Sequence, residues 1–207
     1  KFDDAHQCLQ QALQIQDERQ ACQTPLYVRT LEELGLVVKE LVRLRDAIVL
    51  FDNALKTQLA ISDADPMALA RCYNYLAETH DALGEFEPAI KQYTRGLQIY
   101  LDQNEIQTLS CASIMNNYAV VSLRRHGGLV FEKQGPFTFE SEAFAHAEQL
   151  FAYSAQIIAA QSGTQTHPDE ASALNNQGLA QHNQGHTEQA QASFLRAIDI
   201  AQRTLGN

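Results

Sequence analysis

The sequence predicts an all-α protein, a right-handed α-solenoid (superhelix) of antiparallel helix pairs. Three observations lead to this fold class: small and bulky residues recur with a fixed period, glycine and proline are scarce, and the few prolines lie where helices should begin. With 45% hydrophobic but only 8% aromatic residues, the chain can bury a core built mainly from alanine and leucine. Ten glycines and five prolines in 207 residues favour helix over sheet.

The period is 42 residues, and it is seen in alanines at equivalent positions of successive repeats. We call such a set of equivalent positions a column. Ala5, Ala47 and Ala89 stand 42 residues apart, and a bulky residue follows each of them by four positions. Residues three or four apart lie on one face of a helix. The small residue therefore lets a neighbouring helix approach, while the bulky side chain fills the space beside it. Several such repeats predict a stacked array of helix pairs, with Ala147 and Ala190 continuing the column.

Prolines and glycines place the helix ends. Pro25, Pro66 and Pro168 are expected in the first turn of the first helix of a pair, because proline has no N–H to lose there. Gly84 and Gly185 are expected at the turn between paired helices. The residues before the prolines are the expected N-caps: Thr24, Asp65 and His167. The predicted helices cover residues 2–20, 26–42, 45–61, 66–83, 86–103, 107–125, 140–161, 168–184 and 187–204.

These helices group into a single array over residues 1–207. Residues 1–20 are expected to be the second helix of a truncated repeat, and residues 26–61, 66–103, 107–161 and 168–204 to be repeats. The repeat at 107–161 contains an insert near 127–140, in which a small hairpin is possible and Phe131, Phe137 and Phe139 are expected to be partly buried.

Two stretches, residues 76–97 and 176–198, resemble tetratricopeptide repeats. The family pattern of small and bulky residues around a turn glycine is matched by Leu76, Ala77, Gly84, Phe86, Ala89, Tyr93 and Leu97, and by Gly178, Gly185, Ala190, Phe194 and Ala197. The 42-residue period, "HPDEASALNN" and "AQRTLGN" more narrowly resemble the long-helix repeats typified by kinesin light chain. The repeat at 26–61 departs from the pattern, because Val42 stands where the turn glycine should be.

Composition and motifs exclude several functions. A net charge of −10 with scattered lysines and arginines argues against a nucleic-acid partner, and no apolar run reaches the roughly 18 residues of a membrane span. No catalytic or phosphate-binding motif is present, so no enzyme activity and no cofactor are expected. His182 and His186 lack a third ligand, so no metal is expected either. The four cysteines have no CxxC spacing and are expected to be small buried side chains in a reducing compartment, the cytoplasm.

The first helices of the pairs should line the concave groove of such an array. Asn117 and Asn176 occupy the same column there, and an amide can both donate to and accept from the backbone of an extended peptide. Related repeats hold peptide main chain with an asparagine in this column, so the resemblance implies the same role for both residues. The alternative is that they bond to adjacent helices or to water. Further candidates for peptide or partner contact on this surface are Asn74, Asn116, Asn175, Arg124, Arg71, Asn183 and Glu78.

The expected function is therefore that of a non-catalytic scaffold that recognises an extended peptide or partner segment in the concave groove. Acidic residues of the first two complete repeats, Glu32, Glu33 and Glu78 among them, predict that one end of the ligand is basic. Two alternatives remain: a ligand-sensing regulatory segment of a larger effector protein, or a self-associating module that uses its terminal repeats. Leu195, Ile198 and Leu205 on the outer face of the last helix favour self-association.

Overall fold

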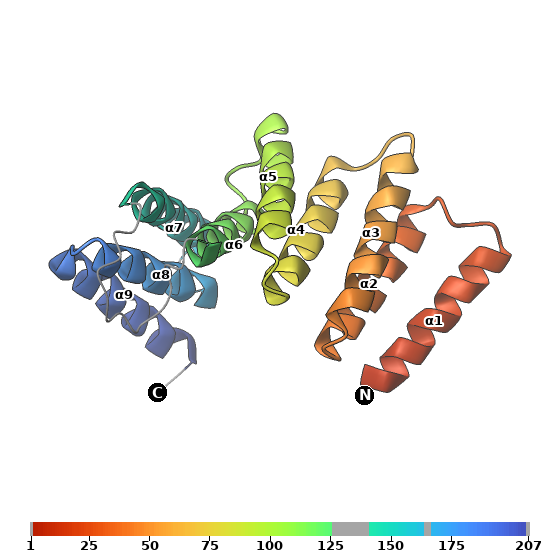
Figure 1. The fold of residues 1–207 in the computed structure, drawn as a ribbon, viewed down its shortest axis with the longest axis horizontal. Coiled ribbons are helices and arrows are strands. Elements are labelled where there is room, and N and C mark those ends of the chain that lie inside the picture. Colours follow the sequence, from red (N-terminus) through yellow and green to blue (C-terminus); the bar gives the residue numbers. More distant parts are fainter. Residues whose placement is uncertain (1, 126–140, 164–166, 206–207) are drawn as a thin grey trace. The chain divides into compact units, whose positions relative to one another are not determined.

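The computed structural model describes residues 2–125, 141–163 and 167–205. Within these residues it contains nine helices and no strand, so the chain is an all-α solenoid of helix pairs, as predicted (Figure 1). The helices are α1 (Phe2–Glu18), α2 (Pro25–Glu40), α3 (Leu44–Ala60), α4 (Pro66–Ala82), α5 (Phe86–Asp102), α6 (Leu109–Arg125), α7 (Ser141–Ser162), α8 (Pro168–Asn183) and α9 (Thr187–Leu205). Their ends lie within about two residues of the predicted ones.

The chain divides into two compact units, Lys1–Gln103 (unit 1) and Asn104–Asn207 (unit 2). In unit 1, α2 pairs with α3 and α4 pairs with α5, while α3 also packs on α4 and α1 on α2. In unit 2, α6 pairs with α7 and α8 pairs with α9, while α7 also packs on α8. Each unit thus contains two complete helix pairs, and consecutive helices in a unit lie side by side (Figure 1).

The small-residue column is buried where helices meet, as predicted. Ala47 and Ala89 are fully buried and Ala190 is 2% exposed. Phe51 and Tyr93, four residues after the two alanines of unit 1, are also buried. The column fails only in α1, which contains no buried residue, so that Ala5 is partly exposed.

A second small-residue position lies opposite these aromatic side chains. A Cβ atom on Gly35 of α2 would lie 2.5 Å from the Phe51 ring of α3, and a Cβ atom on Gly178 of α8 would lie 2.7 Å from the Phe194 ring of α9. Glycine at these positions therefore allows an aromatic ring to pack directly on the backbone of the paired helix.

The N-caps form as expected. The side chains of Thr24, Asp65 and His167 accept hydrogen bonds from the backbone N–H groups of Tyr27, Met67 and Asp169, respectively. A proline lies in the first turn of each of these three helices. The start of α6 was predicted two residues too early, because it has no proline; Thr108 caps it, accepting a hydrogen bond from the N–H of Cys111.

The turns between paired helices require a left-handed residue, and unit 1 meets this requirement unevenly. Gly84 and Gly185 have φ values of 74° and 83° at their turns. Val42 has a φ of 60° at the corresponding turn between α2 and α3, with its side chain 79% exposed. A β-branched residue is strained in this conformation, because its Cβ substituents crowd the backbone.

Replacing Val42 with glycine should therefore stabilise unit 1. Removing a β-branched side chain from the left-handed conformation should relieve about 1–2 kcal/mol of backbone strain. Part of this gain is offset by the greater conformational freedom of glycine in the unfolded chain. We expect a net gain of about 0.5–1 kcal/mol in the free energy of unfolding, measured by urea denaturation. Gly84→Val is the matched control and should lose stability. An unchanged or lower denaturation midpoint for Val42→Gly would contradict the strain.

The prediction for the cysteines is half wrong. Cys72 and Cys111 are buried, but Cys8 is exposed and Cys22 is partly exposed. Cys8 lies on α1, which buries no residue, and Cys22 lies in the connection to α2, so neither position is enclosed by neighbouring helices. All four thiols are free.

The predicted insert at 127–140, with its possible hairpin and Phe131, Phe137 and Phe139, lies outside the described residues. The helices on either side of it still pack together, because Ala119 and Leu123 of α6 form one buried cluster with Phe144 and Phe151 of α7. On α9, Leu195 and Ile198 are 59% and 52% exposed, as expected for its outer face. The side chain of Leu205 lies outside the described residues. No helix in the described part of the chain is both long and apolar enough to cross a membrane.

Candidate protein-binding surfaces on the first helices

The residues predicted to contact a partner lie on α2 and α4 in unit 1 and on α6 and α8 in unit 2. We call the surface around Glu32, Lys39, Arg71, Asn74 and Glu78 the first-helix face of unit 1. The surface around Asn116, Asn117, Val120, Asn176 and Leu179 is the first-helix face of unit 2. In each unit, hydrogen bonds between side chains connect its two first helices across this face.

In unit 1, two ion pairs join α2 to α4. The Nε atom of Arg71 donates to both carboxylate oxygens of Glu32 at 3.1 Å, and the Lys39 Nζ atom donates to Glu78 Oε2 at 2.8 Å. Asn74 Nδ2 donates to the other carboxylate oxygen of Glu78 at 2.9 Å. The predicted contact residues Arg71, Asn74 and Glu78 are thus all bonded within the unit.

Glu32 was expected to face the ligand, but its side chain is buried, with only 4% of the residue exposed. Its carboxylate accepts a hydrogen bond from the Cys72 thiol at 3.3 Å in addition to the bonds from Arg71. Burial raises the pKa of the Cys72 thiol, and the nearby negative charge of Glu32 raises it further. Cys72 therefore remains a protonated thiol and is a poor nucleophile.

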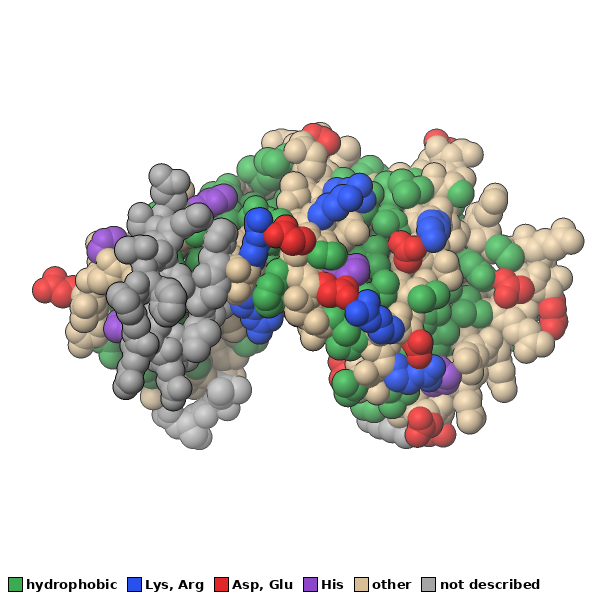
Figure 2. Space-filling view, viewed as in Figure 1, with side chains coloured by type: hydrophobic (Ala, Val, Ile, Leu, Met, Phe, Trp, Pro, Cys, Tyr) green, Lys and Arg blue, Asp and Glu red, His purple; other side chains and the backbone are tan. Residues whose placement is uncertain are grey.

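Two of the carboxylates that were expected to attract the basic end of a ligand are paired within unit 1. The charges of Glu32 and Glu78 are compensated by Arg71 and Lys39, so they cannot attract a basic ligand as free carboxylates would. Glu33 remains exposed. On the side of unit 1 shown in Figure 2, acidic and basic side chains are interspersed rather than separated.

In unit 2, three amides form a chain across the face. Asn176 Nδ2 of α8 donates to Asn116 Oδ1 of α6 at 3.1 Å, and Asn116 Nδ2 donates to Asn117 Oδ1 at 3.3 Å. We call these three residues the amide relay. All three side chains are partly exposed. The structure therefore brings together the two asparagines predicted to contact peptide, with Asn116 between them.

The other predicted contacts in unit 2 are arranged differently. Asn175 is exposed. Asn183 is exposed too, but its Nδ2 donates to the carbonyl oxygen of Leu179 at 2.8 Å in its own helix. Arg124 is exposed and has an interaction of its own. His182 and His186 are both exposed, and no group of three or more metal-ligating side chains occurs in the described ranges.

A polar network between α7, α8 and α9 was not predicted. Glu148 accepts hydrogen bonds from Gln181 at 2.9 Å and from Gln184 at 2.7 Å, and Ser193 donates to Gln181 at 2.8 Å. The bonded pairs are up to 36 positions apart and show no motif, so one sequence contains no signal for the network. It joins the helix pair α8/α9 to α7 rather than forming a ligand site.

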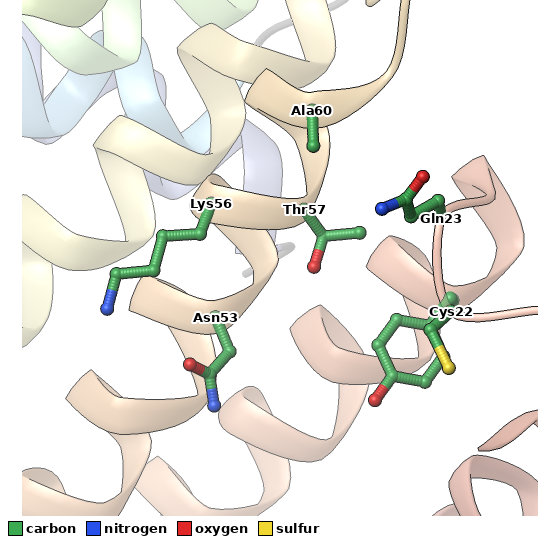
Figure 3. A pocket seen from close by; sticks show the side chains of 7 residues that line it. Cys22, Gln23, Asn53, Lys56, Thr57 and Ala60 are labelled. Atoms are coloured by element: carbon green, nitrogen blue, oxygen red, sulfur yellow. The ribbon is translucent and has the colours of Figure 1, made fainter.

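Unit 1 also contains an open pocket of about 350 Å³ that includes none of the predicted contact residues. Asn53, Lys56, Thr57 and Ala60 line it from one face of α3, and Cys22 and Gln23 line it from the connection between α1 and α2, together with Tyr27 (Figure 3). Its one cation, Lys56, is paired with Asp52 at 2.7 Å. Burial raises the pKa of Tyr27 to about 12, assisted by a hydrogen bond to Asp17, so its hydroxyl stays protonated.

Comparisons with known proteins agree with this architecture. Residues 28–102 and residues 171–204 match two family models that are both described as tetratricopeptide repeat, and together they cover just over half of the chain. No curated protein matches the sequence.

Three solved structures are similar along almost the whole chain. The nearly identical TPR-like repeats of a candidate kinesin light chain from Podosopora anserina have a TM-score of 0.71 at 15% identity, covering 100% of this chain and 90% of that one. The MamA protein has a TM-score of 0.62 at 17% identity, covering 99% and 85%. BtubC (BKLC) from P. vanneervenii has a TM-score of 0.53 at 18% identity, covering 100% and 93%. At these identities the likeness concerns the fold.

Proposed function

Because the chain belongs to the tetratricopeptide repeat superfamily, as its sequence resemblance indicated, we propose that it is a non-catalytic scaffold for an extended peptide. Tetratricopeptide repeats are protein-interaction modules, and the first-helix face of unit 2 is the part of this chain best suited to hold peptide backbone. The peptide would belong to a protein partner and lie across α6 and α8.

The amide relay is the observation that supports this proposal most directly. Each asparagine amide has a donor and an acceptor end. Within the relay, Asn116 uses both ends, whereas Asn117 uses its oxygen and Asn176 uses its nitrogen. The relay therefore ends in an amide nitrogen at Asn117 and an amide oxygen at Asn176. Reversing all three amides together would still leave one donor end and one acceptor end.

A donor end and an acceptor end can pair with the C=O and N–H groups of an extended peptide, and such bonds do not depend on the peptide's side chains. The bond between Asn176 and Asn116 also holds the two helices together, so the alternative structural role of the asparagines is partly realised. The two roles are compatible, because hydrogen bonding within the relay fixes the orientation of the amides before a peptide arrives.

Changing both Asn117 and Asn176 to alanine tests the proposal. Each lost neutral hydrogen bond should cost about 0.5–1.5 kcal/mol, so the double variant should bind peptide roughly 5- to 150-fold more weakly. The measurement is isothermal titration of peptides selected from a random library against the parent protein. Asn53→Ala, an exposed asparagine on α3, is the matched control and should bind normally.

Circular dichroism should show that both variants remain helical. If the selected peptides bind the double variant as tightly as they bind the parent, the asparagines are structural only. The proposed peptide contact would then be wrong.

A further inference from the structure

The two first-helix faces differ in charge at equivalent positions. One helical turn to either side of the amide relay, the same face of α6 and α8 carries two serines and two aliphatic residues. They are Ser113 and Ser172 on one side, and Val120 and Leu179 on the other. The same columns in unit 1 contain Arg29, Leu36, Arg71 and Glu78.

In unit 1 the four charged groups that define this face are bonded to one another in two pairs, while Arg29 is exposed outside them. Arg71 and Glu78 of α4 are held by Glu32 and Lys39 of α2, and the contacts are 2.8–3.1 Å long. A peptide carboxylate or ammonium group would have to replace one of these existing partners. That exchange gains little, because one ion pair is broken for each one formed.

In unit 2 the connection between the first helices is neutral and incomplete. The amide relay joins α6 to α8 through a single hydrogen bond and has an unused donor end and an unused acceptor end. Val120 and Leu179 are partly exposed, and both follow the relay by one turn. Val120 is backed by the buried cluster of α6 and α7, which holds it in place.

We infer that the first-helix face of unit 2 selects an uncharged stretch of extended peptide, with an apolar side chain placed against Val120 and Leu179. The first-helix face of unit 1 does not contribute to the choice of ligand. This inference rests on the proposed function and names the chemistry of its ligand. The relay holds the peptide backbone, the aliphatic pair chooses the side chain, and the ion pairs of unit 1 hold α2 and α4 together.

The ligand selection itself gives the first test. Peptides selected from a random library by the full chain should have an aliphatic or aromatic residue at one position and no charged residue beside it. Their dissociation constants should change less than about twofold between 50 mM and 500 mM NaCl, because no free charge pair is formed. Enrichment of acidic or basic peptides, or a large weakening by salt, would overturn the inference.

Two variants test the contributions of the two first-helix faces to binding separately. Val120→Thr keeps the shape of the side chain but replaces a methyl group with a hydroxyl, and it should weaken binding roughly tenfold. The double variant Lys39→Met/Glu78→Met removes one ion pair of unit 1 and should leave the dissociation constant within about twofold. If Lys39→Met/Glu78→Met loses binding and Val120→Thr does not, unit 1 contacts the ligand and the inference is wrong.

The outcomes distinguish this inference from the proposed function. Peptides that depend on Asn117 and Asn176 but are charged would support backbone binding and overturn the inference about ligand chemistry. Uncharged peptides that bind the double asparagine variant normally but lose affinity in Val120→Thr would support the inference about the apolar side chain. Such a result would also show that the amide relay does not hold the peptide backbone. If no peptide is selected, both are wrong.

Discussion

Replacing Arg71 with methionine is expected to lower the free energy of unfolding of unit 1 by about 3 kcal/mol. The change leaves the Glu32 carboxylate 4% exposed without its charge partner, and only the Cys72 thiol remains bonded to it. Breaking a buried ion pair from one side costs about 3–5 kcal/mol, because the remaining charge stays desolvated. We take the low end of this range because the Arg71 side chain is 41% exposed and already partly screened.

Hydrogen exchange of backbone amides suits this measurement, because it reports stability helix by helix in a protein whose repeats need not unfold together. Protection should fall in α2 and α4, while the amides of α9 provide an internal reference. The matched control is the double variant Glu32→Met/Arg71→Met, which removes both charges at similar volume and should lie within about 1 kcal/mol of the parent. Equal protection in the single variant and the parent would show that the pair contributes nothing.

Replacing Gly35 with valine is expected to cost about 2–3 kcal/mol. Even a single Cβ atom at this position would approach the Phe51 ring to 2.5 Å, and the ring is fully buried, so it has no space into which it can move. Overpacking of this kind forces side chains out of their preferred rotamers or shifts the backbone. The loss should appear as a lower urea midpoint followed by circular dichroism.

The corresponding change in unit 2 is a matched comparison. A Cβ atom on Gly178 would meet the Phe194 ring at 2.7 Å, but Phe194 is only partly buried and can turn toward solvent. Gly178→Val should therefore cost less than Gly35→Val. Phe51→Leu should also reduce the cost of Gly35→Val, which a double-mutant cycle would detect. Equal losses in both units, with no coupling to Phe51, would mean that ring contact is not the cause.

Much of the fold could be predicted because each repeat carries its own local signals. The alanine column predicted which helix faces pack against each other. The three prolines and the N-caps before them predicted where three of the helices begin. Gly35 was overlooked although a signal existed: Gly35, Ala77, Ala119 and Gly178 form a further small-residue column, on the first helices of the pairs. Ala77 and Gly178 were named in the family pattern, but a column of small residues was traced only through the second helices of the pairs.

The site was predicted less completely, because equivalent positions are not necessarily positions in contact. The repeat period is 42 residues, but the Glu32–Arg71 and Lys39–Glu78 pairs both join residues 39 apart, about one helical turn less. Likewise, Asn176 bonds to Asn116 rather than to its equivalent, Asn117. The offset depends on how two helices slide along each other when they pack, and a single sequence does not encode it in a readable form.

The helix pair α6/α7 has a consequence for engineering the chain. Arg125 ends α6 and Ser141 begins α7, yet both helices contribute to one buried cluster, as paired helices with a short turn do. The entropy of closing a connection grows only with the logarithm of its length, by about 0.6 kcal/mol for each doubling. The interface between α6 and α7 therefore holds the pair, and a longer connection would add little entropic cost. Foreign sequence, such as an epitope or a fluorescent reporter, could be carried between these two helices while Phe144 and Phe151 keep their places.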